Sequence, residues 1–368
     1  LWLIDLHSVS RRRWLTPRRC FWNLSLLNHF FIGRATATDR LRFFRAYWHG
    51  RCLTDAGPAA GLPPAVLGNL NQKTVRKVEA FCRRAARRAY RKGDRKWSRG
   101  NRRLIIADTP ACQCRGVVEL GREQLTRLRD EVLNNPRLTG GGPATGLPPV
   151  VLEAIVEHPR RAWEIGHAFL RRGIHTPRPL WFVEATDGSA SVLVTDGVPG
   201  AVSLSMAAAR APSNSDAKEA GLGRDVEHAH GGLVTESLLR QAAGNLGVQL
   251  RRMHEHGFDH RRLTAETVLV RPHDGHVWLT DLEHAVPLRW RQQARIVTAL
   301  ARLEHSLPND PALGRTHRLR FLLRYLGHQR RREWKSLWLA VSRRDEGRSQ
   351  DRLSSKFHHG DAETRRNA

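Results

Sequence analysis

The chain has 368 residues, enough for one large domain with tails or for two domains of ordinary size. Its 62 Lys and Arg stand against 35 Asp and Glu, a net charge of +27, and the excess is nearly all arginine. No run approaches the ~18 apolar residues of a membrane-spanning helix, and no signal peptide is visible. We therefore expect a cytoplasmic protein. A nucleic-acid binder would carry such charge, but no recognition motif accompanies it, and arginine-favouring codon usage explains the excess equally well.

The cysteines are odd in number and scattered, which argues against a disulfide framework. Only Cys112 and Cys114 lie close together, and a single C-x-C pair is a weak zinc signal. We expect free thiols in a reducing compartment.

An internal repeat opens the chain. Residues 1–6, Leu-Trp-Leu-Ile-Asp-Leu, return as Val-Trp-Leu-Thr-Asp-Leu at 277–282, and further matches follow in the same order. These matches pair Leu24, Leu27 and His29 with Leu300, Leu303 and His305, and Arg40–Phe43 and Tyr47 with Arg318–Phe321 and Tyr325. Ordered blocks indicate duplication. Because Leu1 stands inside an apolar run, we expect the chain to begin within a truncated first copy.

The elements between the copies come from periodicity and punctuation. Residues 74–92 predict an amphipathic, arginine-rich helix that ends near Gly93, followed at 95–103 by a basic linker or the approach to a first strand. Short apolar runs predict strands at 103–107, 115–120 and 149–156.

The second copy continues with a helical pattern over 158–172, closed by Gly173. Two strands around the turn Asp187-Gly188 predict a hairpin. The remaining predicted elements are strands 179–184 and 190–195, helix 233–256, and strands 268–271 and 276–280. Strands with one helix, then a mainly helical half, indicate an α+β fold with two lobes. Residues 346–368 are polar and predict a disordered tail.

Residues 254–281 resemble the catalytic segment of the protein-kinase superfamily. Three flanking stretches are similar to the lipopolysaccharide kinase (Kdo/WaaP) family: Arg172 to Pro179, Val194 to Gly200 and His256 to His260. The resemblance covers about 1–55 and 150–330. It implies a protein-kinase-like two-lobed fold, with a β-rich N-lobe and a mainly helical C-lobe.

The resemblance also implies a domain plan. We expect residues 1–73 to be the C-lobe remnant of a first copy and 74–100 a basic helix and linker. The second kinase-like domain would span 101–345, with an N-lobe at about 101–197 and a C-lobe at about 198–345.

The kinase loop H-R-D-L-x-x-x-N carries an aspartate that orients the acceptor hydroxyl and an asparagine that binds metal. Here it reads His260-Arg-Arg-Leu-Thr-Ala-Glu-Thr267, so Arg262 stands at the base position and Thr267 at the metal position. A guanidinium does not accept a proton at neutral pH. Only a shifted geometry would let Asp259 or Glu266 act as the base. Asp281 is retained at the metal-binding aspartate, as is Asp5 in the first copy.

The phosphate-clamping lysine is also missing. No lysine occurs between Trp97 and Ala217, and Glu153 takes its expected position on the strand before helix 158–172. A carboxylate there would repel a polyphosphate, so we expect weak ATP binding. Glu164 in helix 158–172 could be the usual ion-pair partner of that lysine. Because the lysine is missing, we expect Glu164 to be a solvated helix residue.

Other candidates have plainer interpretations. The glycine-rich stretch 139–146 could be a phosphate loop, but it lacks the Gly-Lys-Ser/Thr ending and contains Pro143, so a connector is expected. His254, His256 and His260 could bind metal, but His260 fits a loop-scaffolding role and the other two would complement a helix dipole. Trp2 and Trp278 are expected to pack in the core.

The family resemblance implies ATP-dependent phosphorylation of a lipopolysaccharide core sugar, with Mg²⁺, at the inner face of the cytoplasmic membrane. The missing groups imply that the second copy is a pseudokinase in which Asp281 is the only retained catalytic element. The alternative is a non-catalytic scaffold or regulator that binds a partner protein or a polyanion.

Overall fold

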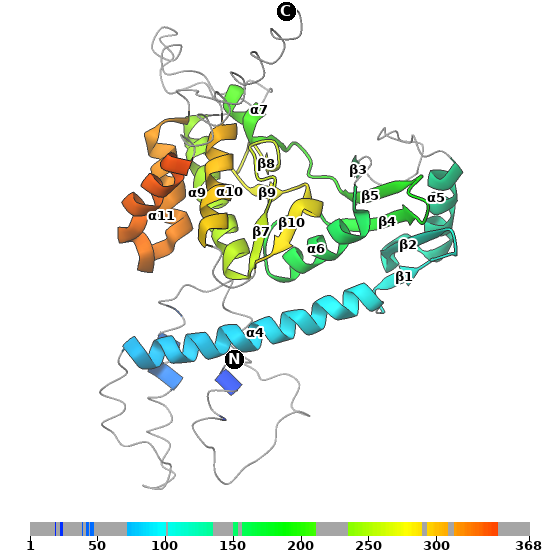
Figure 1. Ribbon diagram of the computed structural model, residues 1–368, viewed down its shortest axis with the longest axis horizontal. Helices are drawn as coiled ribbons and strands as arrows, with labels where there is room; N and C mark the ends of the chain where they lie inside the picture. The colour runs from blue at the N-terminus through cyan, green and yellow to red at the C-terminus, as the bar shows by residue number, and fades with distance from the viewer. Residues whose placement is uncertain are drawn as a thin grey trace, which may run out of the picture. The chain divides into compact units, whose positions relative to one another are not determined.

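The fold is seen in a computed structural model (Figure 1). The structure describes residues 72–100, 102–134, 150–153, 157–210, 235–288, 293–307 and 313–344, with a few single positions before residue 72. Asp5, the glycine-rich stretch 139–146, the tail 346–368 and nearly all of the expected first copy lie outside them. The chain divides into two compact units, Leu1–Arg95 and Lys96–Ala368. The site lies in the second.

Helix α4 runs from Gln72 to Arg99, so the expected end near Gly93 is wrong. A single glycine costs a helix only about 1 kcal/mol, and Lys96 and Arg99 complement the dipole of the last turn. The helix ends instead before Gly100, which has a φ of 102°, a conformation that glycine adopts readily and other residues rarely do. The expected linker at 95–103 is therefore mostly helical.

The N-lobe contains a five-stranded antiparallel sheet with the order β1-β2-β4-β5-β3. Its strands are β1 (Leu104–Ile106), β2 (Cys112–Val117), β3 (Val150–Glu153), β4 (Pro179–Ala185) and β5 (Ser191–Asp196). The expected hairpin is present as β4 and β5. The strand expected at 115–120 is displaced, since β2 ends at Val117 and a 3-10 turn, η2 (Val118–Leu120), follows.

Helix α5 (Arg122–Asn134) is absent from the sequence expectations. Its buried face is Leu125, Leu128 and Val132, a helical spacing that covers one side of the sheet. Gly116 on β2 admits this helix, because a Cβ there would lie 2.8 Å from a methyl group of Leu125.

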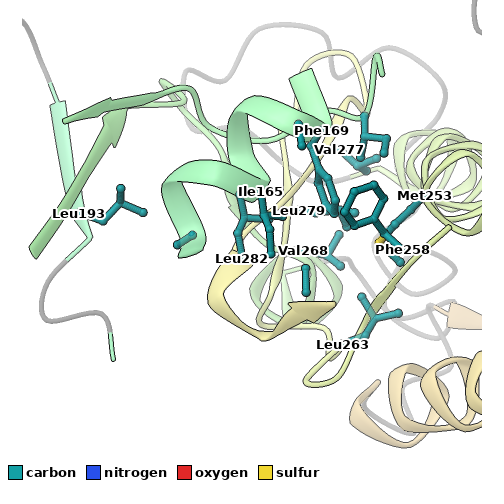
Figure 2. Packing of buried hydrophobic residues seen from close by; sticks show 14 of the residues in the cluster. Ile165, Phe169, Leu193, Met253, Phe258, Leu263, Val268, Val277, Leu279 and Leu282 are labelled. Carbon is teal, nitrogen blue, oxygen red and sulfur yellow. The ribbon is translucent and has the colours of Figure 1, made fainter. Parts of the chain in front are cut away.

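Helix α6 (Pro159–Arg171) joins the sheet to the helical lobe. Trp163 and Phe169 are almost fully buried, and the Phe169 ring meets Phe258 edge-on at 5.3 Å between centroids. Figure 2 shows Ile165 and Phe169 of this helix facing Leu279 of the catalytic segment and Leu282 just after it. One apolar core therefore runs through both lobes and fixes α6 against the segment that carries the site.

The helical lobe confirms the mainly helical second half. It comprises α7 (Leu204–Ala209), α9 (Glu236–Glu255), α10 (Gln293–Ser306), α11 (Arg315–Arg330), the turn η6 (Arg331–Glu333) and a helix over 334–344. Thr235 caps α9 by accepting a hydrogen bond from the Leu238 N–H at 3.3 Å. Among the described helices, none combines the length and the apolarity that crossing a membrane requires.

Short strands frame the catalytic segment. They are β6 (Val202–Ser203), β8 (Val268–Val270) and β9 (Val277–Leu279) in one sheet, and β7 (Phe258–His260) and β10 (Ala285–Pro287) in another. Trp278 on β9 is only half-buried and lies under the Arg271 guanidinium, 5.1 Å from it, so the expectation that it packs in the core is wrong. It faces outward because neighbouring strand residues alternate between the two faces.

Candidate functional site

The loop at 261–267 is held between the two short sheets. His260 pairs with Ala285 across β7 and β10, and the Arg261 N–H donates to the His284 carbonyl at 3.0 Å. At its other end the Thr280 N–H donates to the Thr267 carbonyl at 3.0 Å. These backbone bonds bring the loop beside Asp281, which follows β9 directly.

His260 is fully buried, and its Nε2 is hydrogen-bonded to the Thr280 carbonyl at 3.0 Å. Burial lowers the pKa of its imidazole to about 4, so the ring is neutral at physiological pH. This is the arrangement expected of a scaffolding histidine. It ties the start of the loop to the residue before Asp281.

Asp281 is the one non-glycine residue of the described chain with a positive φ, at 55° with ψ 45°. Aspartate tolerates this left-handed conformation better than most residues, at some cost in backbone energy. Its carboxylate is half-buried, and Oδ1 lies 3.6 Å from Nε2 of His284. A strained, accessible carboxylate after a buried strand is consistent with a functional position.

Arg262 and Thr267 are the residues that the sequence predicts at the base and metal positions of the kinase pattern. Arg262 is exposed. The Thr267 hydroxyl accepts from the Thr264 N–H and donates to the Thr264 carbonyl, both at 3.0 Å. The hydroxyl is therefore used to close the loop on itself.

Of the two carboxylates near the base position, one is buried and the other is hydrogen-bonded to a neighbouring helix. Asp259 is only 4% exposed, burial raises the pKa of its carboxyl, and Oδ1 lies 3.9 Å from Nε2 of His254. Glu266 is exposed and accepts a hydrogen bond from the Ser205 hydroxyl on α7. The geometry gives no support for a shifted base.

Glu153 is the last residue of β3, an edge strand in which it pairs with Leu193 of β5. This strand precedes α6, as the sequence predicts for the strand of the missing lysine. On α6, Glu164 forms a surface ion pair with Arg160, 3.4 Å from Oε1 to Nε. Such an exposed pair contributes little to stability, in keeping with a solvated helix residue.

His254 and His256 do not form a metal site with His260. His254 is buried in α9 and its Nδ1 is bonded to the Tyr325 hydroxyl at 2.8 Å, while His256 caps the helix. Burial lowers the pKa of His254 to about 3. A neutral ring carries no charge to place on the helix dipole, so that expectation is wrong for His254.

Sequence reasoning missed the contact between the two lobes at Glu283. Its Oε2 accepts the His158 N–H at 2.9 Å, at the start of α6, and Oε1 lies 3.3 Å from Nε2 of His284. Glu157, Glu283 and His284 hold ligand atoms within 4.8 Å of one another, the one such group in the described part of the chain. A helix N-terminus disfavours a cation, so we assign Glu283 to capping α6.

The residues present do not fit a complete Mg–ATP site. Magnesium in kinases is held by a carboxylate and an amide side chain together with phosphate oxygens. Here Asp281 offers the carboxylate, but the hydroxyl of Thr267 is committed within the loop.

Comparisons with known proteins bear on the same region. Residues 156–325 match the model of the lipopolysaccharide kinase (Kdo/WaaP) family. Among solved structures, the chain is similar to WaaP in complex with acyl carrier protein, at 20% identity over 51% of this chain and 76% of that one, with a TM-score of 0.38. No curated protein matches the chain. The lobes and the segment 254–281 give this region a protein-kinase-like fold, and the match to the lipopolysaccharide kinase (Kdo/WaaP) family covers residues 156–325, a little under half of the chain.

Proposed function

We propose that this chain is a lipopolysaccharide-kinase homologue whose second kinase-like copy is a pseudokinase. The observation that carries this proposal is the exposed arginine at position 262, with one neighbouring carboxylate, Asp259, buried and the other, Glu266, hydrogen-bonded to Ser205. General bases and electrostatic groups each supply several kcal/mol of transition-state stabilisation. A site that lacks two or three of them would retain little catalytic power.

The family role would be ATP-dependent phosphorylation of a lipopolysaccharide core sugar at the inner face of the cytoplasmic membrane. With its own activity lost, the domain at 101–345 would act as a non-catalytic scaffold or regulator that binds a partner protein or a polyanion. The glycolipid would then be a ligand of this domain rather than its substrate. Asp281 would be the one remaining metal ligand, with weak nucleotide binding.

A thermal-shift titration with Mg-ATP tests the nucleotide side of this proposal. We expect no saturable rise in Tm at sub-millimolar nucleotide. A site that bound Mg-ATP with a Kd one hundred times below the ligand concentration would gain about 2.7 kcal/mol, a rise of several degrees. MgCl₂ without nucleotide is the control. A saturable rise with Mg-ATP that Asp281→Asn removes would contradict the proposal.

A further inference from the structure

A groove with five arginines lies between α9 and α11, the helices that pack along each other in the helical lobe (Figure 1). Its volume is about 610 Å³. We call it the arginine groove and define it by Arg240 and Arg251 of α9, Arg320 and Arg324 of α11, and Arg331 just beyond α11. None of these residues belongs to the catalytic segment 254–281.

Glycines allow the arginines of the two helices to converge. A Cβ on Gly247 would lie 2.5 Å from the Phe321 carbonyl oxygen, so only glycine permits this approach of α9 to α11. At Gly327, with φ 67°, a Cβ would lie 2.1 Å from Nη1 of Arg251. The Arg251 guanidinium therefore occupies space that any other residue at 327 would fill.

The charge in the groove is largely uncompensated. Arg240 is paired with Glu236 on its own helix. In the part of the chain that the structure describes, no ion pair joins Arg251, Arg320, Arg324 or Arg331 to a carboxylate. Guanidiniums that face one groove repel each other, and an anion between them would relieve that repulsion.

The dimensions of the groove restrict the ligand. Arg240 and Arg251 are eleven residues apart, roughly 16 Å along the helix. The volume of about 610 Å³ is typical of small-ligand sites.

The groove is also partly apolar. Val248, Leu319 and Leu323 line it, and Leu319 is 37% exposed. Such a surface would add nothing to the binding of a nucleic-acid backbone. It suits a ligand in which an anionic group is attached to an apolar body.

We propose that the arginine groove binds the phosphate headgroup of an anionic phospholipid and so holds the helical lobe against a bilayer surface. The guanidiniums would take the phosphate oxygens through paired N–H donors, while the glycerol and first acyl carbons would lie on Val248, Leu319 and Leu323. This site is separate from the catalytic cleft, and it would operate whether or not the cleft is active.

Vesicle co-sedimentation of the full chain tests the arginines. We expect binding to vesicles that contain phosphatidylglycerol and little binding to pure phosphatidylcholine. Each basic residue near an anionic surface contributes about fivefold in affinity, so Arg320→Gln with Arg324→Gln should weaken binding roughly 25-fold. The matched control is Arg122→Gln with Arg127→Gln, which removes the same charge from exposed positions on α5. Urea midpoints of both variants check that they are folded.

Leu319→Asn tests the apolar contact and separates a lipid from free phosphate. We expect it to weaken vesicle binding severalfold while leaving the affinity for inorganic pyrophosphate unchanged. The proposal is overturned if the Arg320/Arg324 variant and the Arg122/Arg127 control bind vesicles equally weakly, because binding would then depend on net charge alone. It is also overturned if the wild-type chain does not co-sediment with phosphatidylglycerol vesicles, or if Leu319→Asn leaves its affinity for these vesicles unchanged.

Discussion

The free energy of unfolding should be about 5 kcal/mol lower at pH 5 than at pH 7, because three buried histidines must be neutral in the folded chain. Burial lowers the pKa of His167 and His254 to about 3 and that of His260 to about 4. In the unfolded chain these groups titrate near 6.5, and each unit of difference is about 1.4 kcal/mol. With a total stability of about 5–15 kcal/mol, the chain would be close to unfolding at pH 5.

The direction follows from which state binds the proton. A histidine with a lowered folded pKa contributes stability above about pH 6.5, and that contribution is lost as the pH falls towards the folded value. Asp259 works in the opposite sense, since burial raises the pKa of its carboxyl and folding is favoured when it is protonated. One carboxyl offsets only part of the effect of three imidazoles.

Urea unfolding at pH 7, 6 and 5 measures this effect. We expect the midpoint to fall steeply across the series. His167→Gln should make the fall clearly less steep, since it removes one of the buried imidazoles whose pKa is lowered. His273→Gln is the control, because the His273 side chain is 71% exposed. A midpoint that stays constant down to pH 5 would show that these rings are solvated.

Gly247→Ala should destabilise the chain by about 2 kcal/mol. The new Cβ would lie 2.5 Å from the Phe321 carbonyl oxygen and 3.0 Å from the Tyr325 nitrogen, and both are backbone atoms of α11. Overpacking of this kind costs about 1–3 kcal/mol even after relaxation, and the better helix propensity of alanine returns about 1 kcal/mol at most. Movement of α11 would disturb its packing on α9, so we expect an overpacking cost near the upper end, about 3 kcal/mol. After the gain in helix propensity, a net loss of about 2 kcal/mol remains.

Gly244→Ala, one turn earlier on α9, is the matched control. Its Cβ would meet Nε of Arg320 at 3.2 Å, the flexible part of a long side chain that can move aside. Here the helix propensity of alanine should dominate and leave stability unchanged or raise it by up to about 1 kcal/mol. Chemical denaturation of the two variants gives the comparison. Equal effects would mean that the helices are not held in close contact at Gly247.

Much of the fold follows from local pattern. The buried face of α6 and the turn at Gly188 are visible in the sequence, because helical spacing and a positive-φ glycine are local features. Helix α5 was missed although Leu125 and Leu128 have helical spacing, because charged residues surround them. The end of α4 was misplaced because Gly93 and Gly100 look alike in sequence, and only Gly100 has a positive φ.

The candidate site divides in the same way. The place of His260 beside Thr280 follows from the spacing of the catalytic segment, since a hairpin brings the two together. The Glu283 contact with the start of α6 joins residues 125 positions apart and has no local signal. The burial of Asp259 is also invisible in sequence, because it depends on the packing of β7 against β10 and α9.

Phosphate transfer from labelled Mg-ATP, with purified lipopolysaccharide as acceptor, tests the pseudokinase proposal. We expect the chain to transfer or release no more phosphate than a reaction without protein, because Arg262 cannot act as a base, Asp259 is buried and Glu266 is held by Ser205. Transfer well above that background, lost on Asp281→Asn, would show that this domain is an active kinase.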